Sequence, residues 1–185
     1  MATQAQPHTW TYDDLLALPD DGTRYEIIDG ELCPMPAPNA VHATIIINLI
    51  VRVFGPLIDT LGLRLLTAPL DVFLGDVGPV QPDLLVLLPD QLGLIGTRGV
   101  EGPPALVVEV LSPSNPEHDR IVKRAAYARG GVREYWLVSP EAAIVEILAL
   151  AGDRYRTHAR VAGDEPLSSL VLPTLTAPAA LIFPT

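Results

Sequence analysis

The stretch VQPDLLVLLPD, from Val80 to Asp90, constrains the fold most, because its centre is an unbroken apolar run, Leu84 to Leu88. A short apolar run bounded by prolines is typical of a buried strand. A second such run, PPALVVEVLSPS, follows at Pro103 to Ser114. Asp83 stands at the head of the first run and Glu109 inside the second. A buried carboxylate costs free energy unless a partner compensates it, so both acids are candidate site residues.

The segments around these strands predict a mixed sheet with helices packed on it. We expect a short helix at 11–19, a hairpin at 24–36 around Asp29-Gly30, a long buried helix from Asn39 to about Leu61, and a capped helix from Asn115 to Gly131. Further strands are expected at 63–75 and 133–161. The helix between the Glu109 strand and the next strand is typical of a crossover between parallel neighbours. The predicted class is α/β (α+β), a central mixed sheet flanked by helices.

Length and composition indicate one globular domain, residues 1–185, in which residues 1–10 are expected to be flexible. Hydrophobic residues make up 49% and charged residues 18%. We expect no membrane span and no secretory signal, and the single cysteine, Cys33, favours a cytoplasmic location. The net charge of −10 argues against a protein that binds nucleic acid with its whole surface. Five basic residues nevertheless gather between Arg120 and Arg133, and a solvated helix face is the alternative interpretation of this cluster.

The two acids require an explanation because side chains alternate across a strand, so that Glu109 shares a face with Val107 and Leu111. Two carboxylates in a dry site repel, and both then favour protonation. A divalent cation such as Mg²⁺ would remove the conflict. The alternative is that each carboxylate binds a loop amide or an arginine.

Lysine usage draws attention to one further residue. The chain has eleven arginines and a single lysine, Lys123. A lysine offers a compact ammonium whose pKa shifts on burial, whereas an arginine remains charged and forked. Lys123 lies in the helix that follows Glu109, and Tyr127 shares its face one turn later. A plain surface pair between Lys123 and Asp119 is the alternative.

Four strings of the sequence together resemble the Uma-two restriction-endonuclease family, a branch of the PD-(D/E)xK nuclease superfamily: YEIIDGEL, QPDLLV, LVVEVLSPS and DRIVKRAAYARGGVREYWLV. The resemblance runs from about Tyr12 to nearly the end of the chain. It implies a restriction-endonuclease-like fold with Asp83 and Glu109 as the acidic pair. The usual lysine of the superfamily would fall at Leu111, which is unsuited to the role, and Lys123 matches a lysine relocated to the next helix.

The resemblance also implies a function: metal-dependent hydrolysis of phosphodiester bonds, with DNA as the expected partner. Asp83 and Glu109 would hold Mg²⁺ or Mn²⁺, with a carbonyl from Val110, and Lys123 would act on the attacking water or the phosphate. Glu31 and His42 match further site residues of the family, although an exposed hairpin acid and a helix-start histidine are the alternatives. Nucleic-acid contacts are expected from the basic helix, at Arg120, Arg124, Tyr127 and Arg129, although Tyr127 could instead simply pack.

Two other functions stay open at this point: a non-cleaving binding or assembly module that keeps the nuclease fold, and a hydrolase of a small phosphoester. A homodimer is expected if both strands of a duplex are cut, because each chain carries one site.

Overall fold

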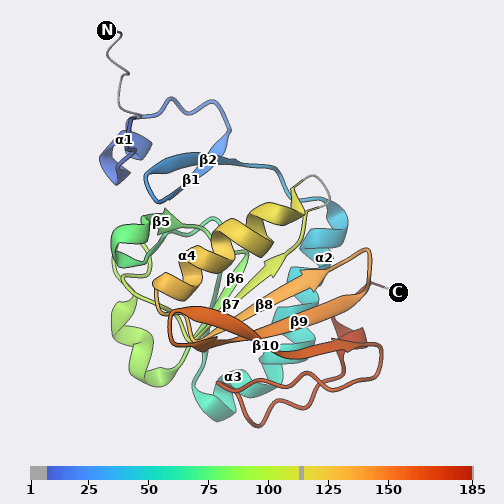
Figure 1. Cartoon of the computed structure of the whole chain (residues 1–185). Helices are drawn as coiled ribbons and strands as arrows, with labels where there is room; N and C mark the ends of the chain where they lie inside the picture. The colour runs from blue at the N-terminus through green and yellow to red at the C-terminus, as the bar shows by residue number, and fades with distance from the viewer. Residues whose placement is uncertain (1–7, 113–114, 185) are drawn as a thin grey trace, which may run out of the picture.

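The computed structural model describes residues 8–112 and 115–184 (Figure 1). The expectation of a flexible start therefore falls largely outside the described residues, since residues 1–7 are not among them. Trp10, which is described, donates its backbone N–H to the carbonyl of Gly30 at 2.8 Å.

A six-stranded mixed sheet forms the centre of the molecule, as the sequence predicts. Its order is β10-β9-β8-β7-β6-β3. Strands β7 and β8 run parallel, as expected for a helical crossover, and the other neighbours run antiparallel. The bounds are β3 (Arg64–Thr67), β6 (Leu84–Leu87), β7 (Leu106–Val110), β8 (Glu134–Ser139), β9 (Ile144–Ala151) and β10 (Arg154–Ala162).

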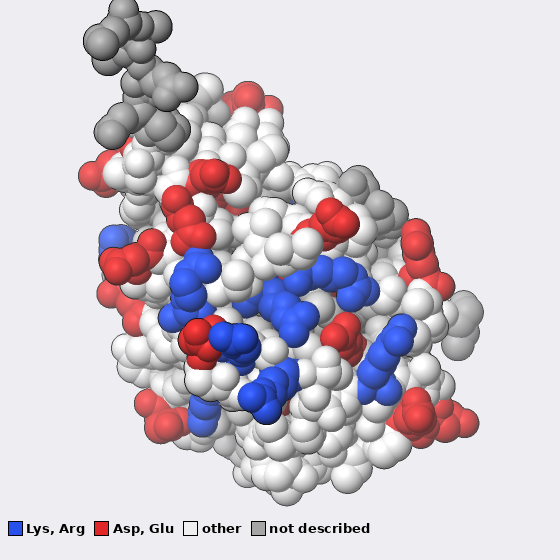
Figure 2. Space-filling view, viewed as in Figure 1, with Lys and Arg blue, Asp and Glu red and all other residues white. Residues whose placement is uncertain are grey.

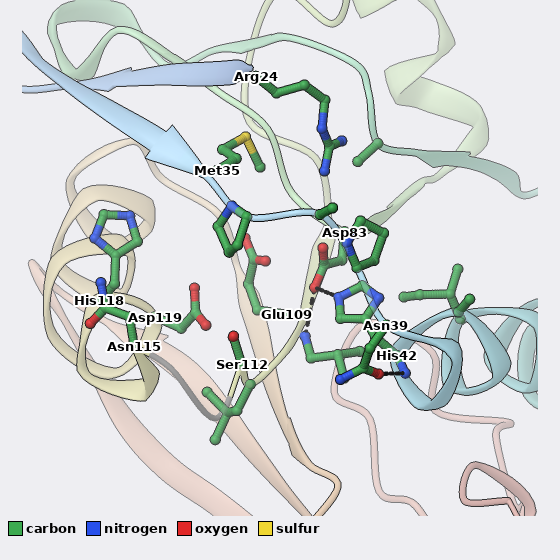
Figure 3. Close-up of a pocket in the computed structure, with 18 of the residues that line it drawn as sticks. Arg24, Met35, Asn39, His42, Asp83, Glu109, Ser112, Asn115, His118 and Asp119 are labelled. Atoms are coloured by element: carbon green, nitrogen blue, oxygen red, sulfur yellow. Dashed lines mark hydrogen bonds and ion pairs between the residues drawn. The ribbon is translucent and has the colours of Figure 1, made fainter. Parts of the chain in front are cut away.

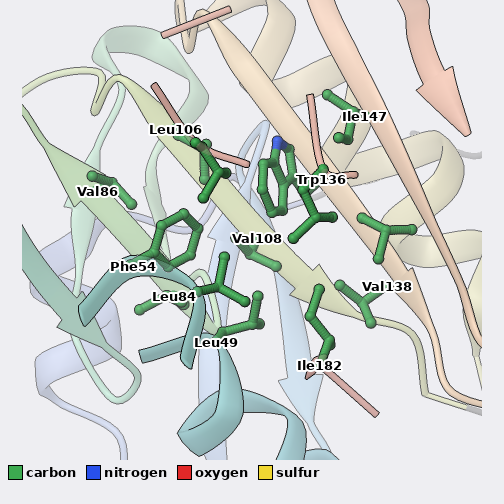
Figure 4. Close-up of a cluster of buried hydrophobic side chains, with 14 of the residues drawn as sticks. Leu49, Phe54, Leu84, Val86, Leu106, Val108, Trp136, Val138, Ile147 and Ile182 are labelled. Atoms are coloured by element: carbon green, nitrogen blue, oxygen red, sulfur yellow. The ribbon is translucent and has the colours of Figure 1, made fainter. Parts of the chain in front are cut away.

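Helices cover both faces of this sheet (Figure 1). A continuous helical run covers one face and consists of α2 (Ala40–Asn48), a π-helical segment η1 (Leu49–Phe54) and α3 (Gly55–Leu61). Its core side packs Leu49 and Phe54 against Leu84, Val108 and Trp136 (Figure 4). A second helical run, η4 (His118–Lys123) and α4 (Arg124–Arg129), covers the other face. There Tyr127 packs on Tyr135, with ring centroids 5.1 Å apart.

The long helix is buried along one stripe only, so the prediction of a buried helix is wrong for its outer side. Ile45 and Leu49 are fully buried, whereas Ile47 is 59% and Val51 63% exposed. Dense apolar residues do not tell which side faces a sheet, because packing decides it. By length and composition Ala40–Leu61 could cross a membrane, a test that a core helix of a soluble protein also passes.

The other elements are short and lie outside the central sheet. The hairpin of β1 (Arg24–Ile28) and β2 (Glu31–Met35) turns at Asp29-Gly30, where φ is +54° and +77°. Two positive φ values in succession are what a tight hairpin turn requires, and Asp-Gly suits them. The remaining elements are α1 (Tyr12–Leu16), β4 (Val72–Phe73), η2 (Gly75–Val77), β5 (Pro79–Val80), η3 (Pro89–Leu94) and η5 (Ala179–Leu181).

Candidate functional site

Asp83 and Glu109 lie on adjacent strands and on one face of the sheet. Leu84 pairs with Val108 in the antiparallel ladder of β6 and β7, so Asp83 stands opposite Glu109 one position further. Both carboxylates line a cavity of about 820 Å³, which is bordered by the hairpin, the start of α2 and the start of η4 (Figure 3). The apolar pattern of the two strands thus places both acids at one site.

His42 and a backbone amide hold Asp83. The His42 Nε2 lies 2.9 Å from Oδ2 of Asp83, and the Val110 N–H donates to the same oxygen at 2.8 Å. Burial alone would raise the pKa of Asp83, but the hydrogen bond and charge of His42, with smaller effects of Lys123 and Val110, hold that pKa below its ordinary value. The lowered pKa favours the ionised form of Asp83 even though the side chain is largely buried.

Glu109 has the opposite tendency. Its Oε1 accepts from Lys123 Nζ at 3.0 Å and from the Tyr127 hydroxyl at 2.6 Å. Burial raises the pKa of Glu109 well above its ordinary value, and the negative charges of Asp83, Asp119 and Glu26 raise it further, against the lowering effect of Lys123. Two neighbouring carboxylates with pKa values shifted apart are typical of functional sites.

Lys123 is the cation of this cluster, and it is not a surface residue. It is only 3% exposed, and its Nζ lies 3.0 Å from Glu109, 3.4 Å from Glu26 and 4.0 Å from Asp119. Burial lowers the pKa of Lys123, but these carboxylates outweigh burial and raise the pKa above its ordinary value. Lys123 stands in π-helical η4, a geometry frequent at functional sites. The pair with Asp119, which was the alternative interpretation of Lys123 as a surface residue, is only the longest of its three ion pairs.

Sequence reasoning missed Glu26 and His118, which complete the cluster. Glu26, on β1, accepts from His118 Nε2 at 3.0 Å and from the backbone N–H of Gln81 at 3.1 Å. Burial raises the pKa of Glu26, but Lys123 and His118 lower it by more, so the net pKa lies below the ordinary value. The signal was present in RYEII, because Glu26 is an acid inside an apolar strand, as Glu109 is.

Two residues expected at the site do not line the cavity. Glu31 is exposed and is not among the described residues that line the cavity. It is the first residue of β2, directly after the turn of the hairpin. Tyr127 is fully buried and its hydroxyl is held by Glu109, so the expected contact with nucleic acid is wrong. Its packing and its hydrogen bond instead fix the Glu109 carboxylate.

Arg120 and Arg129 of the basic helix are exposed and Arg124 is half-buried, and all three are already engaged. Arg120 pairs with Glu146 at 3.4 Å, Arg124 donates to the carbonyl of Tyr155 at 3.2 Å, and Arg129 donates to both oxygens of Asp29 at 2.6 Å. Figure 2 shows a band of basic side chains over α4 and the neighbouring strands β9 and β10. None of these three arginines lines the cavity.

The charge of the cavity favours a cation. Four carboxylates, those of Glu26, Asp83, Glu109 and Asp119, influence one another's ionisation there, and Lys123 is the one lysine among them. Within residues 8–112 and 115–184, no group of three or more histidine, cysteine or acidic side chains is arranged to hold a metal. Asp83 and Glu109 nevertheless suffice as protein ligands for Mg²⁺, which commonly uses one or two carboxylates and completes its shell with water and phosphate.

Comparisons with known proteins bear on the family and the fold of this chain. The family model Uma2, described as "Putative restriction endonuclease", matches residues 12–180. A search of curated proteins finds no match. A crystal structure from Anabaena variabilis, described as "a putative nuclease belonging to DUF820", superposes with a TM-score of 0.76 over 94% of this chain and 97% of that chain at 18% identity. At that identity the likeness shows the fold alone. With nearly the whole chain matched by the family model, the protein belongs to the Uma2 family of the restriction-endonuclease-like fold.

Proposed function

We propose that this protein is a metal-dependent endonuclease that hydrolyses phosphodiester bonds of DNA. The observation that carries the proposal is the juxtaposition of Asp83 and Glu109 on adjacent strands, with Lys123 3.0 Å from Glu109. Asp83 and Glu109 would hold Mg²⁺ or Mn²⁺, with help from the backbone carbonyl of Val110. Such an ion would polarise the scissile phosphate and lower the pKa of an attacking water.

The remaining residues of the site would keep these groups in place. His42 and the Val110 N–H fix one oxygen of Asp83, and Tyr127 fixes one oxygen of Glu109. The Lys123 ammonium would orient the attacking water or stabilise charge on the phosphate. Its pKa is raised, so Lys123 stays protonated at neutral pH and would act as a fixed positive charge rather than as a base.

Arg24 would supply a phosphate contact at the cavity. It lines the cavity, and Figure 3 shows its guanidinium pointing toward the side of Asp83. Within the described residues it forms no ion pair, unlike the engaged arginines of α4 and η4. Those arginines would contribute long-range attraction of the nucleic-acid backbone. Cutting both strands of a duplex would further require a two-fold dimer.

One observation favours a second function, a nuclease fold that binds without cleaving. The Lys123 ammonium is enclosed by Glu109, Glu26 and Asp119, so it is fully paired in the absence of substrate. A lysine held in this way could serve only to compensate buried acids. Under this reading Lys123→Arg would leave all measurable properties of the site unchanged except stability.

Plasmid nicking with Mg²⁺ and Mn²⁺ separates the two functions when it is measured with titration calorimetry and melting on the same preparations. We expect wild type to nick, Asp83→Asn to lose both nicking and metal binding, and Lys123→Arg to bind metal but nick about a hundredfold more slowly. Metal binding should also raise the melting temperature of wild type and not of Asp83→Asn. Absence of nicking by folded wild type with either ion would contradict the proposed activity.

A further inference from the structure

The walls of the cavity at the acidic pair are chemically unlike a groove that follows a nucleic-acid backbone. Among the described residues that line it, two are basic, Arg24 and Lys123, and five are acidic, Glu26, Asp83, Glu109, Asp119 and Glu141. A surface that follows the phosphates of an intact duplex gathers lysine and arginine side chains. The arginines of η4, α4 and β10 lie outside this cavity.

Most of the wall is apolar. The exit of β2 contributes one side, and α2 contributes the facing side. Figure 3 shows the Met35 side chain at the cavity. The apolar lining residues include Leu32, Pro34, Met35, Pro36, Val41, Ile46, Ile47 and Leu111. An apolar pocket of this size with a few convergent polar groups is typical of a site for an organic group.

Access to the acids limits how a substrate can approach. Glu109 is 2% exposed, and the side chains of Asp83 and His42 are only 15% and 19% exposed. Cleavage requires the phosphate to come within direct contact of these acids or of an ion on them. A phosphate on the outside of a paired, stacked duplex brings its neighbouring phosphates and both strands with it, whereas an unpaired nucleotide can enter alone.

We propose that this cavity receives one unpaired nucleotide, with its base against the apolar wall of Met35 and Ile47 and its phosphate between Arg24 and the acidic pair. This inference rests on the proposed endonuclease function and specifies its substrate class. The enzyme then acts on single strands, bulges and mismatches in preference to matched duplex. Burying the faces of a base on apolar side chains is favourable, and a methionine thioether makes favourable contacts with aromatic rings.

Four fluorescent DNA substrates of one sequence test the proposal: a single strand, a matched duplex, the duplex with a one-nucleotide bulge, and that bulge with an abasic nucleotide. We expect kcat/KM with Mn²⁺ to be at least about tenfold higher for the single strand and the bulge than for the matched duplex. The abasic bulge should lose most of that gain, because it lacks the base that the apolar wall would bury.

A matched pair of variants locates the effect. Ile47 and Val51 are both well exposed on one helical run, but Ile47 lines the cavity and Val51 does not. Ile47→Gln should lower kcat/KM for the bulge about fivefold, since it removes apolar contact, and Val51→Gln should leave it unchanged. Equal effects of the two variants would overturn the assignment of the wall.

Equilibrium binding by fluorescence anisotropy, without metal, keeps this inference separable from the endonuclease activity. Tighter binding of the bulge than of either the duplex or the abasic bulge supports the inference, even where no DNA is cleaved. An absence of cleavage would then contradict only the proposed endonuclease activity. Equal binding and equal cleavage of paired and unpaired DNA would overturn the unpaired-nucleotide site and leave the endonuclease proposal standing.

Discussion

Two buried glutamates on neighbouring parallel strands, Glu109 of β7 and Glu134 of β8, have opposite surroundings. Glu134 is fully buried and accepts hydrogen bonds from three uncharged donors: the Trp136 indole at 2.6 Å and the backbone N–H groups of Leu170 and Val171 at 2.7 and 3.2 Å. Glu109 is just as buried, but it borders a cavity, pairs with Lys123 and lies within the influence of three other carboxylates.

The difference shows that burial of an acid does not by itself indicate a site. Neutral donors satisfy Glu134, which holds the segment around Leu170 against the sheet. The surroundings of Glu109 leave unbalanced negative charge beside open space, which a cation or a substrate can relieve. Unbalanced charge facing a cavity is therefore the better criterion, and four substitutions test it.

The largest effect is expected for Glu109→Gln. The amide keeps an acceptor for Tyr127 but removes the charge from the acidic pair, so nicking should fall on the order of 10²–10³-fold. The melting temperature should stay near that of wild type, because Lys123 keeps Glu26 and Asp119 as partners. Nicking rates and melting curves measured together check this result, and unchanged nicking would exclude Glu109 from the chemistry.

Glu134→Gln should show the reverse pattern. One carboxylate oxygen becomes an NH₂ group that faces either the Trp136 indole or the two backbone N–H groups, so at least one buried donor loses its acceptor. We expect a loss of about 2–3 kcal/mol in the free energy of unfolding. Nicking by the folded variant should match wild type, as measured below its melting temperature. A selective loss of nicking would place Glu134 in the site after all.

The fold was largely predictable because its signals are local. The strands β6 and β7, the Asp29-Gly30 turn and the crossover helix follow from apolar runs, turn residues and caps within a few positions. The two faces of the long helix were not predictable, since only packing against the sheet distinguishes Ile45 from Ile47.

The site was predictable only in part, for a similar reason. Asp83, Glu109 and Lys123 stood out as an acid at a strand head, an acid in a strand and a solitary lysine. The pairing of Glu26 with His118 joins residues 92 positions apart, and no local pattern reports it. Glu31 was selected in place of Glu26 because the resemblance gave a motif but not which side chain of the hairpin turns inward.

A smaller effect is expected for Asp119→Asn, and it depends on pH. Burial, with the charge of Asp83, raises the pKa of Asp119 to about 6 despite Lys123. Because the folded state then holds a proton that the unfolded state releases from about pH 4 upward, the contribution of Asp119 to stability falls as the pH rises from about 4 to 6.

Asn cannot ionise, so Asp119→Asn should gain stability relative to wild type across this range and reach a constant advantage on the order of 3 kcal/mol above pH 7. Denaturant unfolding of both proteins without metal, at several pH values, measures the difference. An advantage that does not change between pH 4 and 7 would show that Asp119 is not strained by its neighbours.

The smallest effect is expected at the ion pair of Arg129 with Asp29, which lies on the surface and is the counterpart of the buried cluster. Both side chains are about half exposed, although Arg129 contacts both carboxylate oxygens at 2.6 Å. Exposed pairs contribute about 0–1 kcal/mol, because water screens the charges and ordering two side chains costs entropy. Asp29 also has φ of +54° in the hairpin turn, a conformation that asparagine tolerates well. Asp29→Asn should therefore change the free energy of unfolding by less than about 1 kcal/mol.

The same substitution would also release Arg129 from its partner, so DNA affinity at low salt should rise slightly and lose that gain at high salt. Anisotropy titrations at two salt concentrations, with Arg129→Gln as the control that removes the charge, measure this change. A large loss of stability or of nicking in Asp29→Asn would mean that charge pairs far from the cavity matter as much as those within it.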